Sequence, residues 1–99
     1  MQMPLNTVLP AQKTRLAQPQ ISHLIRQLRQ GMGLTQEQFA MVLGVTYTTI
    51  NRWENAHMQP SPLALKQIRL MLKELSTTAD PEYRQQWQLM LEDSFPEAT

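Results

Sequence analysis

Two helix-start signals lie close together in the middle of the chain, with a glycine between them. Thr35 is followed three residues later by Gln38, which is the pattern of a capping box, and Thr46 suits the residue before a second helix. Gly44 ends the first of these helices, because glycine takes the left-handed conformation at little cost. The elements predicted from these signals are helices over 36–43 and 47–55 and a tight turn at 44–46.

Three further helical patterns flank this pair, and no segment alternates apolar and polar residues as a strand does. The first begins at Gln20 and is ended by Gly31 and Gly33. The second begins at Ser61-Pro62, a cap followed by proline, and runs to about Leu75. A break is expected at 76–79, and the last helix covers 81–93 with Asp80 as its cap. The residues expected on the inner faces are Ile21, Leu24, Ile25, Leu28, Phe39, Ala40, Val42, Leu43, Ile50, Trp53, Leu63, Ile68, Met71, Leu72 and Leu75.

The fold class predicted is all-α, with five helices. A chain of 99 residues suits one small domain and is too short for the large catalytic architectures. Residues 1–19 contain three prolines and no sustained period, so they are expected to form a flexible N-terminal arm. Residues 20–75 then form the main domain, and residues 76–99 add a C-terminal amphipathic helix.

The net charge of +1 conceals an uneven distribution. Residues 1–20 carry a net charge of +2 and residues 21–73 a net charge of +4, whereas residues 74–99 carry −5. A basic body favours a polyanionic or acidic partner, although ordinary scatter of surface charge explains the same numbers.

Several classes of function are disfavoured by what the sequence lacks. The absence of cysteine excludes disulfides, thiolate zinc sites and a cysteine nucleophile. His23 and His57 are far apart in the chain and have no clustered acids beside them, so neither a metal nor another cofactor is expected. No nucleophile with a base and no phosphate-binding glycine loop is present, which argues against an enzyme. No transmembrane stretch or signal peptide is found either, and a cytoplasmic protein is expected.

The stretch LTQEQFAMVLGVTYTTINRWENAHMQPSP resembles the helix-turn-helix of the phage-repressor and Cro-like proteins, the XRE-type family. With the preceding helix, the resemblance covers about residues 20–75. It implies a compact five-helix domain in which the helix over 47–55 enters the major groove of DNA. Ala56-His57 replaces the glycine that commonly follows the Glu-Asn pair, so the loop there is expected to take another conformation.

The resemblance also implies roles for individual residues. The base-edge contacts expected on the outward face of the recognition helix are Tyr47, Thr48, Asn51 and Arg52. Gln36 and Thr46, at two helix N-termini, are the expected phosphate contacts. Arg29 and Glu54 are expected to form a partly buried structural ion pair. A purely structural reading stays open for Tyr47, and core packing is favoured over base stacking for Trp53.

The last helix presents large side chains that suggest a contact between two copies of the chain. They are Tyr83, Trp87, Met90 and Leu91. We expect them to form a homodimer or partner contact, because such proteins usually pair across two-fold sites. The alternative is that this helix folds back and completes the chain's own core.

The function predicted is a sequence-specific, DNA-binding transcriptional regulator, most simply a repressor, acting as a homodimer on a palindromic operator. One alternative is an antitoxin that binds a toxin protein and regulates its own operon. Another is a domain that only binds proteins, in which case salt-sensitive DNA binding would be absent.

Overall fold

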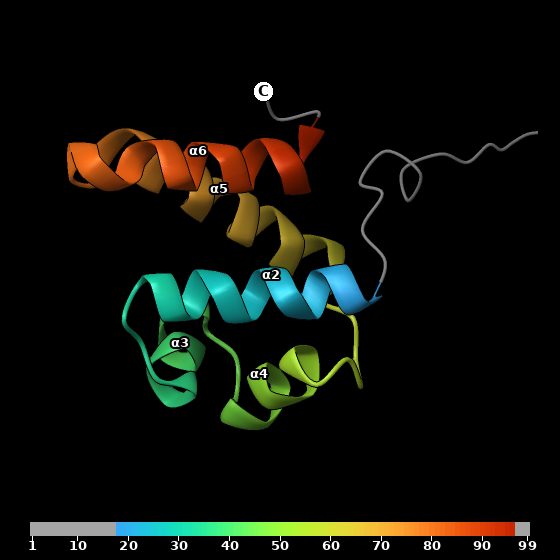
Figure 1. Cartoon of the computed structure of the whole chain (residues 1–99). Coiled ribbons are helices and arrows are strands. Elements are labelled where there is room, and N and C mark those ends of the chain that lie inside the picture. The colour runs from blue at the N-terminus through green and yellow to red at the C-terminus, as the bar shows by residue number, and fades with distance from the viewer. Residues whose placement is uncertain (1–17, 97–99) are drawn as a thin grey trace, which may run out of the picture.

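The computed structural model describes residues 18–96, and within them the chain forms five helices and no strand. The helices are α2 (Gln18–Gly31), α3 (Gln36–Leu43), α4 (Tyr47–Glu54), α5 (Pro62–Thr78) and α6 (Pro81–Ser94) (Figure 1). The predicted all-α class is confirmed for this part of the chain. The expected N-terminal arm lies outside the described residues up to residue 17, and its last two residues belong to α2.

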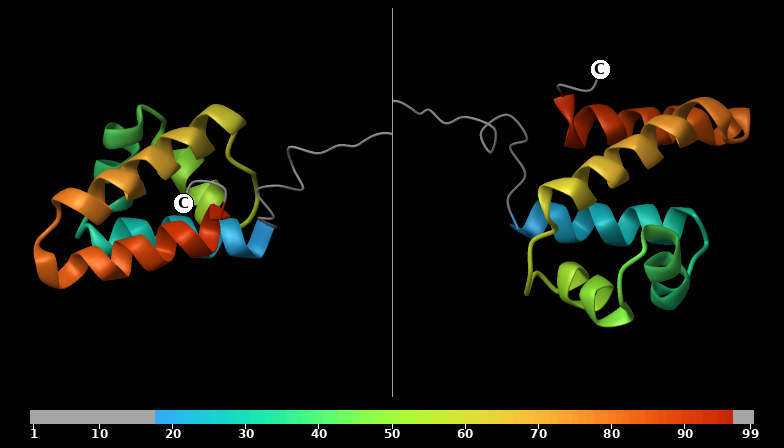
Figure 2. Two further views of the ribbon diagram at one scale, coloured as in Figure 1. Left: turned by 90° about the horizontal axis from the view of Figure 1, so that it is seen from above. Right: turned by 180° about the vertical axis from the view of Figure 1, so that it is seen from behind.

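Helix α2 lies in the middle of the molecule, with other helices on two opposite sides. The short helices α3 and α4 lie on one side, and α5 and α6 form an antiparallel hairpin on the other (Figures 1 and 2). One cluster of buried side chains includes residues from all five helices. The domain boundary predicted near residue 75 falls inside α5, and α6 contributes Trp87 and Leu91 to the same cluster.

All but two of the side chains expected on the inner faces are buried or half-buried. Ile21, Leu24, Ile25 and Leu28 are all buried along α2, as their spacing predicts. The expectation for Val42 and Leu63 is wrong, since they are 52% and 68% exposed. In α5 the buried row is Ala64, Ile68 and Leu72, so Leu63 lies outside that row. Phe95, which the periodicity did not single out, is also buried.

The predicted break after Leu75 is wrong, because α5 continues to Thr78. The three hydroxyl side chains there bond back to helix carbonyls instead of ending the helix. Ser76 donates to the carbonyl of Lys73 at 2.6 Å, and Thr77 and Thr78 donate to that of Glu74 at 3.0 and 2.8 Å. This local back-bonding satisfies the hydroxyl groups without requiring the backbone to leave the helix. Asp80 makes no side-chain capping bond to α6, contrary to expectation.

Gly31 has a different role from the helix-ending one predicted for it. Gly33 is the left-handed residue after α2, with φ of 72°, whereas Gly31 is the last residue of the helix itself. A Cβ atom on Gly31 would lie 2.5 Å from Cη2 of Trp87. The missing side chain therefore allows the indole of Trp87 to pack against the end of α2.

Candidate nucleic-acid interface

Helices α3 and α4 are joined by a turn whose geometry follows from three residues. Gly44 is left-handed, with φ of 71°, and the amide of Val45 donates to the carbonyl of Ala40 at 3.0 Å. The hydroxyl of Thr46 then accepts from the amide of Thr49 at 3.1 Å and begins α4. Ala40 is 4% exposed, and its small side chain suits the close packing of the two helices.

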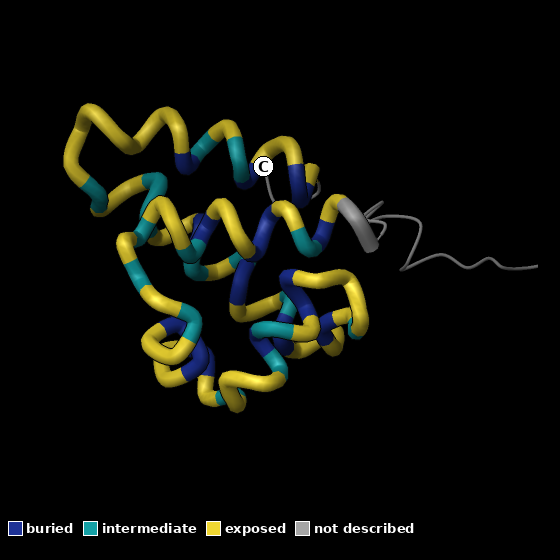
Figure 3. The backbone as a smooth tube through the Cα atoms, turned by 60° about the horizontal axis from the view of Figure 1, so that its bottom comes forward, coloured by how far each residue is buried: buried dark blue, intermediate teal, exposed yellow. Residues whose placement is uncertain are grey.

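The outward face of α4 carries most of the predicted base contacts. Tyr47 is 50% exposed, Thr48 and Arg52 are also exposed, and Asn51 is half-buried. The inward face consists of Ile50, Trp53 and Glu54, all buried. Burial therefore alternates sharply around this short helix, and its exposed side faces away from α2 (Figure 3). Packing in the core is confirmed for Trp53, whose indole N–H has no hydrogen-bond partner among the described residues.

A buried carboxylate holds the C-terminal end of α4 in place. The side chain of Glu54 is 2% exposed and accepts two bonds from Arg29, Nε to Oε2 at 2.6 Å and Nη2 to Oε1 at 3.0 Å. Arg26 donates to the backbone carbonyl of Glu54 at 2.7 Å. Two bonds from one planar guanidinium fix the carboxylate in direction as well as in position. The pair predicted between Arg29 and Glu54 is thus a two-point salt bridge that ties α2 to α4.

The same bridge alters the ionisation of Arg29. Hydrogen bonding to Glu54 raises the pKa of Arg29 above its usual value, partial loss of hydration opposes this, and attraction to the same charge adds to it. A raised pKa in the folded state means that the stabilisation is present below the ordinary arginine pKa. That stabilisation is lost only as the pH rises through the pKa of Arg29 in the folded state, so Arg29 stays charged at every physiological pH.

Gln36, the predicted phosphate contact, belongs to the same polar cluster. Its Nε2 donates to Oε1 of Glu54 at 3.1 Å, and its Oε1 accepts from Nδ2 of Asn51 at 3.4 Å. Asn51 in turn accepts from Nδ2 of Asn55 at 3.2 Å. Two residues predicted to touch DNA are therefore also bonded to each other, which their positions in the sequence did not suggest.

The loop after α4 keeps the conformation that glycine would favour. Ala56 is left-handed, with φ of 60°. Its amide donates to the carbonyl of Trp53 at 3.2 Å, and the amide of His57 donates to that of Arg52 at 2.8 Å. This is the bonding pattern of a Schellman motif. The expectation of another conformation is therefore wrong, because the two bonds hold the backbone in place without glycine.

Replacement of Ala56 by glycine is expected to stabilise the fold by about 1 kcal/mol. A left-handed conformation costs a residue with a Cβ atom about 1–2 kcal/mol, and glycine avoids this cost. The greater conformational freedom of glycine in the unfolded chain offsets about 0.4–1 kcal/mol of that gain. Ala79→Gly is the matched control, since Ala79 has an ordinary φ of −66° and should lose stability. Urea unfolding followed by circular dichroism measures both, and an Ala56→Gly chain no more stable than the parent would contradict the prediction.

The surface expected for dimerisation is only partly exposed. Trp87 and Leu91 are 5% and 2% exposed within the single chain, so they belong to its own core and are unavailable to a partner. The reason is that α6 packs along α5 and places Trp87 on Gly31. Tyr83 remains 49% exposed, and Met90 is half-buried.

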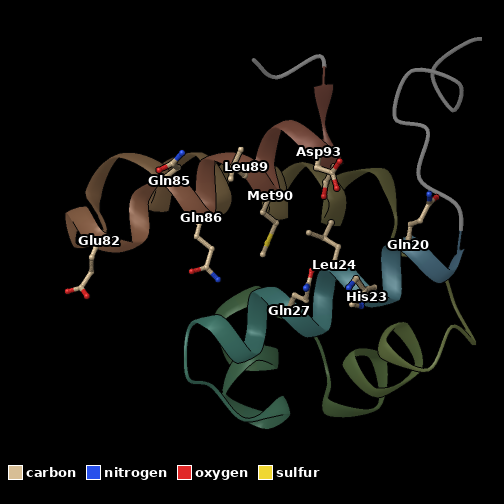
Figure 4. A pocket seen from close by; sticks show the side chains of 11 residues that line it. Gln20, His23, Leu24, Gln27, Glu82, Gln85, Gln86, Leu89, Met90 and Asp93 are labelled. Atoms are coloured by element: carbon tan, nitrogen blue, oxygen red, sulfur yellow. The ribbon is translucent and has the colours of Figure 1, made fainter.

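A groove separates α6 from α2 on the side away from α4. Its wall on α2 includes His23, Leu24 and Gln27, and Gln86 and Met90 point into it from α6 (Figure 4). The other lining residues are Gln20, Glu82, Gln85, Leu89, Asp93 and Ser94. His57 follows α4 in the chain, and within residues 18–96 no three residues that bind metals are grouped together.

None of the helices in residues 18–96 has both the length and the apolar character needed to cross a membrane.

Comparison with known proteins agrees with this geometry. The helix-turn-helix family model matches residues 25–76, just over half of the chain. Over 47 residues the chain is 45% identical to the proteins named uncharacterized HTH-type transcriptional regulator YiaG of Escherichia coli K12 and O157:H7. The match covers 48% of this chain and 49% of each relative, so the chain spans about half the length of the curated relatives it matches. No solved structure matches the chain. The family match and the α3–turn–α4 geometry together show that the chain belongs to the XRE-type helix-turn-helix family.

Proposed function

We propose that the chain is a sequence-specific, DNA-binding transcriptional regulator that acts in the cytoplasm as a repressor. The observation that carries this proposal is the exposed face of α4, where Tyr47, Thr48 and Arg52 project from a helix fixed by the buried Glu54. Such a face offers a hydroxyl donor and acceptor, a methyl group and a guanidinium to base edges in the major groove. The name of the similar Escherichia coli proteins supports the same class of function.

Phosphate contacts are proposed on both sides of this face. Thr46 caps the N-terminus of α4, and a helix N-terminus attracts anions. Gln36 opens α3, is bonded to Asn51 and Glu54 of α4, and keeps a second amide hydrogen beyond the one given to Glu54. Together these groups would position the duplex, while α4 reads it.

We propose that two copies bind one operator. A single α4 reaches only a few base pairs, and proteins of this class usually pair across two-fold sites. The side chains of α6 that remain available for self-association are Tyr83 and Met90, with the exposed Leu89 beside them. These residues belong to α6, which lies across α2 from α4, so a contact there leaves the exposed face of α4 free (Figure 1).

An in-vitro selection of bound duplexes tests the proposal. The expected result is a palindromic consensus with half-sites about 10 base pairs apart, bound with an affinity that falls steeply with salt. A consensus without two-fold symmetry would contradict the proposed homodimer. Binding without any consensus would contradict the proposed sequence-specific regulation.

Arg52→Ala is expected to relax the preference at one position of that consensus. A bidentate arginine–guanine pair discriminates by about 1–3 kcal/mol, so the ratio of affinities for matched and substituted duplexes should fall about tenfold there. Competition binding at fixed salt measures the ratio. Equal weakening on every duplex would instead make Arg52 a phosphate contact.

The antitoxin alternative is favoured by one observation, the groove between α2 and α6. It lies away from α4 and carries Glu82 and Asp93, so a basic protein bound there would not compete with DNA. Co-purification with the product of a small neighbouring reading frame tests this alternative. The absence of any such reading frame would rule it out.

A further inference from the structure

The orientation of the Gln36 amide is dictated by a buried charge. An ionised carboxylate only accepts hydrogen bonds, so the nitrogen of Gln36, and not its oxygen, must face Oε1 of Glu54. Rotating the amide by half a turn would place two oxygens against each other at about the same separation. The oxygen of Gln36 is consequently directed toward α4.

This orientation is passed on to Asn51. Oε1 of Gln36 can only accept, so it selects the nitrogen of the Asn51 amide, which lies 3.4 Å away. On the other side, Oδ1 of Asn51 accepts from Nδ2 of Asn55 at 3.2 Å. Nδ2 of Asn55 also donates to the backbone carbonyl of Asn51 at 2.8 Å, which directs that nitrogen inward. Both bonds to the Asn51 side chain therefore favour the same orientation.

The start of this chain of bonds is held firmly. Glu54 is 3% exposed and is bonded by both nitrogens of Arg29 that face it, so its carboxylate has no freedom to turn. Arg26 fixes the backbone of the same residue. The fixed carboxylate of Glu54 therefore orders the side-chain amides of Gln36 and Asn51, which are partly exposed to solvent.

We propose that Gln36 is a positioning residue for base readout, which transmits the orientation set by Glu54 to the amide of Asn51. The proposal rests on the proposed function. After these bonds Asn51 keeps one N–H and one lone pair, the two groups needed for adenine. Because the positions of the amide nitrogen and oxygen are fixed, Asn51 would bind adenine in one orientation. It would reject a base pair that presents its donor and acceptor in the reverse order.

The test compares Gln36→Met with Asn51→Ala and with the control Gln27→Met, which makes the same change on the groove side of α2. Each protein is titrated with the selected duplex and with duplexes substituted at every consensus position. Asn51→Ala is expected to abolish a preference of about tenfold at one position. Gln36→Met should reduce the preference severalfold at that same position. The double variant should lose no more of the preference there than Asn51→Ala alone. Gln27→Met should leave the preference unchanged at every position.

The contrary results are distinct from a failure of the proposed function. A parent chain that selects no consensus would overturn both proposals. A parent consensus with uniform weakening in Gln36→Met would overturn only this one and leave Gln36 as a phosphate contact. An Asn51→Ala chain with every preference intact would also overturn it.

A second measurement needs no DNA and covers the case in which Gln36→Met binds too weakly to titrate. The side-chain amide signals of Asn51 in the free protein should shift in Gln36→Met and not in Gln27→Met, as recorded by nitrogen–proton correlation spectra. Unchanged Asn51 signals in a folded Gln36→Met chain would overturn the proposal.

Discussion

Replacement of Arg29 by alanine is expected to lower the free energy of unfolding by about 3–5 kcal/mol. The change leaves the carboxylate of Glu54, 2% exposed, without the two charged bonds that compensate for its burial. Gln36 still donates one bond to it, but a neutral amide does not balance a buried charge. Because a small domain has only about 5–15 kcal/mol of stability, this loss should be visible as a large drop in the urea midpoint.

The control for this experiment lies one turn earlier on the same helix. Arg26 is 46% exposed, lies 3.8 Å from the same carboxylate and donates one bond to the backbone carbonyl of Glu54, so Arg26→Ala should cost only about 1–2 kcal/mol. The double change Arg29→Met with Glu54→Met removes the charge as well as its partner and should recover much of the stability. Equal losses from Arg29→Ala and Arg26→Ala would show that the buried charge is not what makes Arg29 important.

Replacement of Trp87 by alanine is expected to cost about 3–5 kcal/mol, because it removes a buried aromatic ring and leaves a cavity. The ring is 5% exposed and packs against the end of α2 at Gly31, where a Cβ atom would meet it. The loss should therefore loosen the contact between the hairpin and α2. Thermal unfolding followed by circular dichroism measures it.

Leu63→Ala is the control, on the other helix of the hairpin. Leu63 is 68% exposed, so its truncation should change the free energy of unfolding by less than about 0.5 kcal/mol. If Trp87→Ala instead kept the parent's stability while altering its oligomeric state, the ring would have to lie at a contact between copies and not in the core.

The helix starts were predictable because their signals are local. Thr35, Thr46 and Ser61 each accept a bond from an amide three residues later, as the sequence indicates. The end of α5 was not predictable in the same way. Serine and threonine serve equally well at caps and in helices where their hydroxyls bond backward, and only packing decides between the two.

The candidate site was predictable in its parts but not in its connections. The outward face of α4 follows from helical spacing and the resemblance, whereas the approach of Arg29 to Glu54 follows from the resemblance alone. The bond between Gln36 and Asn51 depends on how two helices cross, and the placement of Trp87 depends on a glycine in the first described helix. Neither relation leaves a local pattern in the sequence, so both required the three-dimensional structure.

The positions of the two tryptophans provide an optical probe for each side of the molecule. Trp53 is a buried residue of α4, and Trp87 lies in α6 across the central helix. Both rings are shielded from water, so unfolding should shift the fluorescence of each toward longer wavelength. Chains that retain only one of the two therefore report separately on the helix-turn-helix and on the hairpin. Their fluorescence distinguishes a single cooperative transition from the early opening of one side.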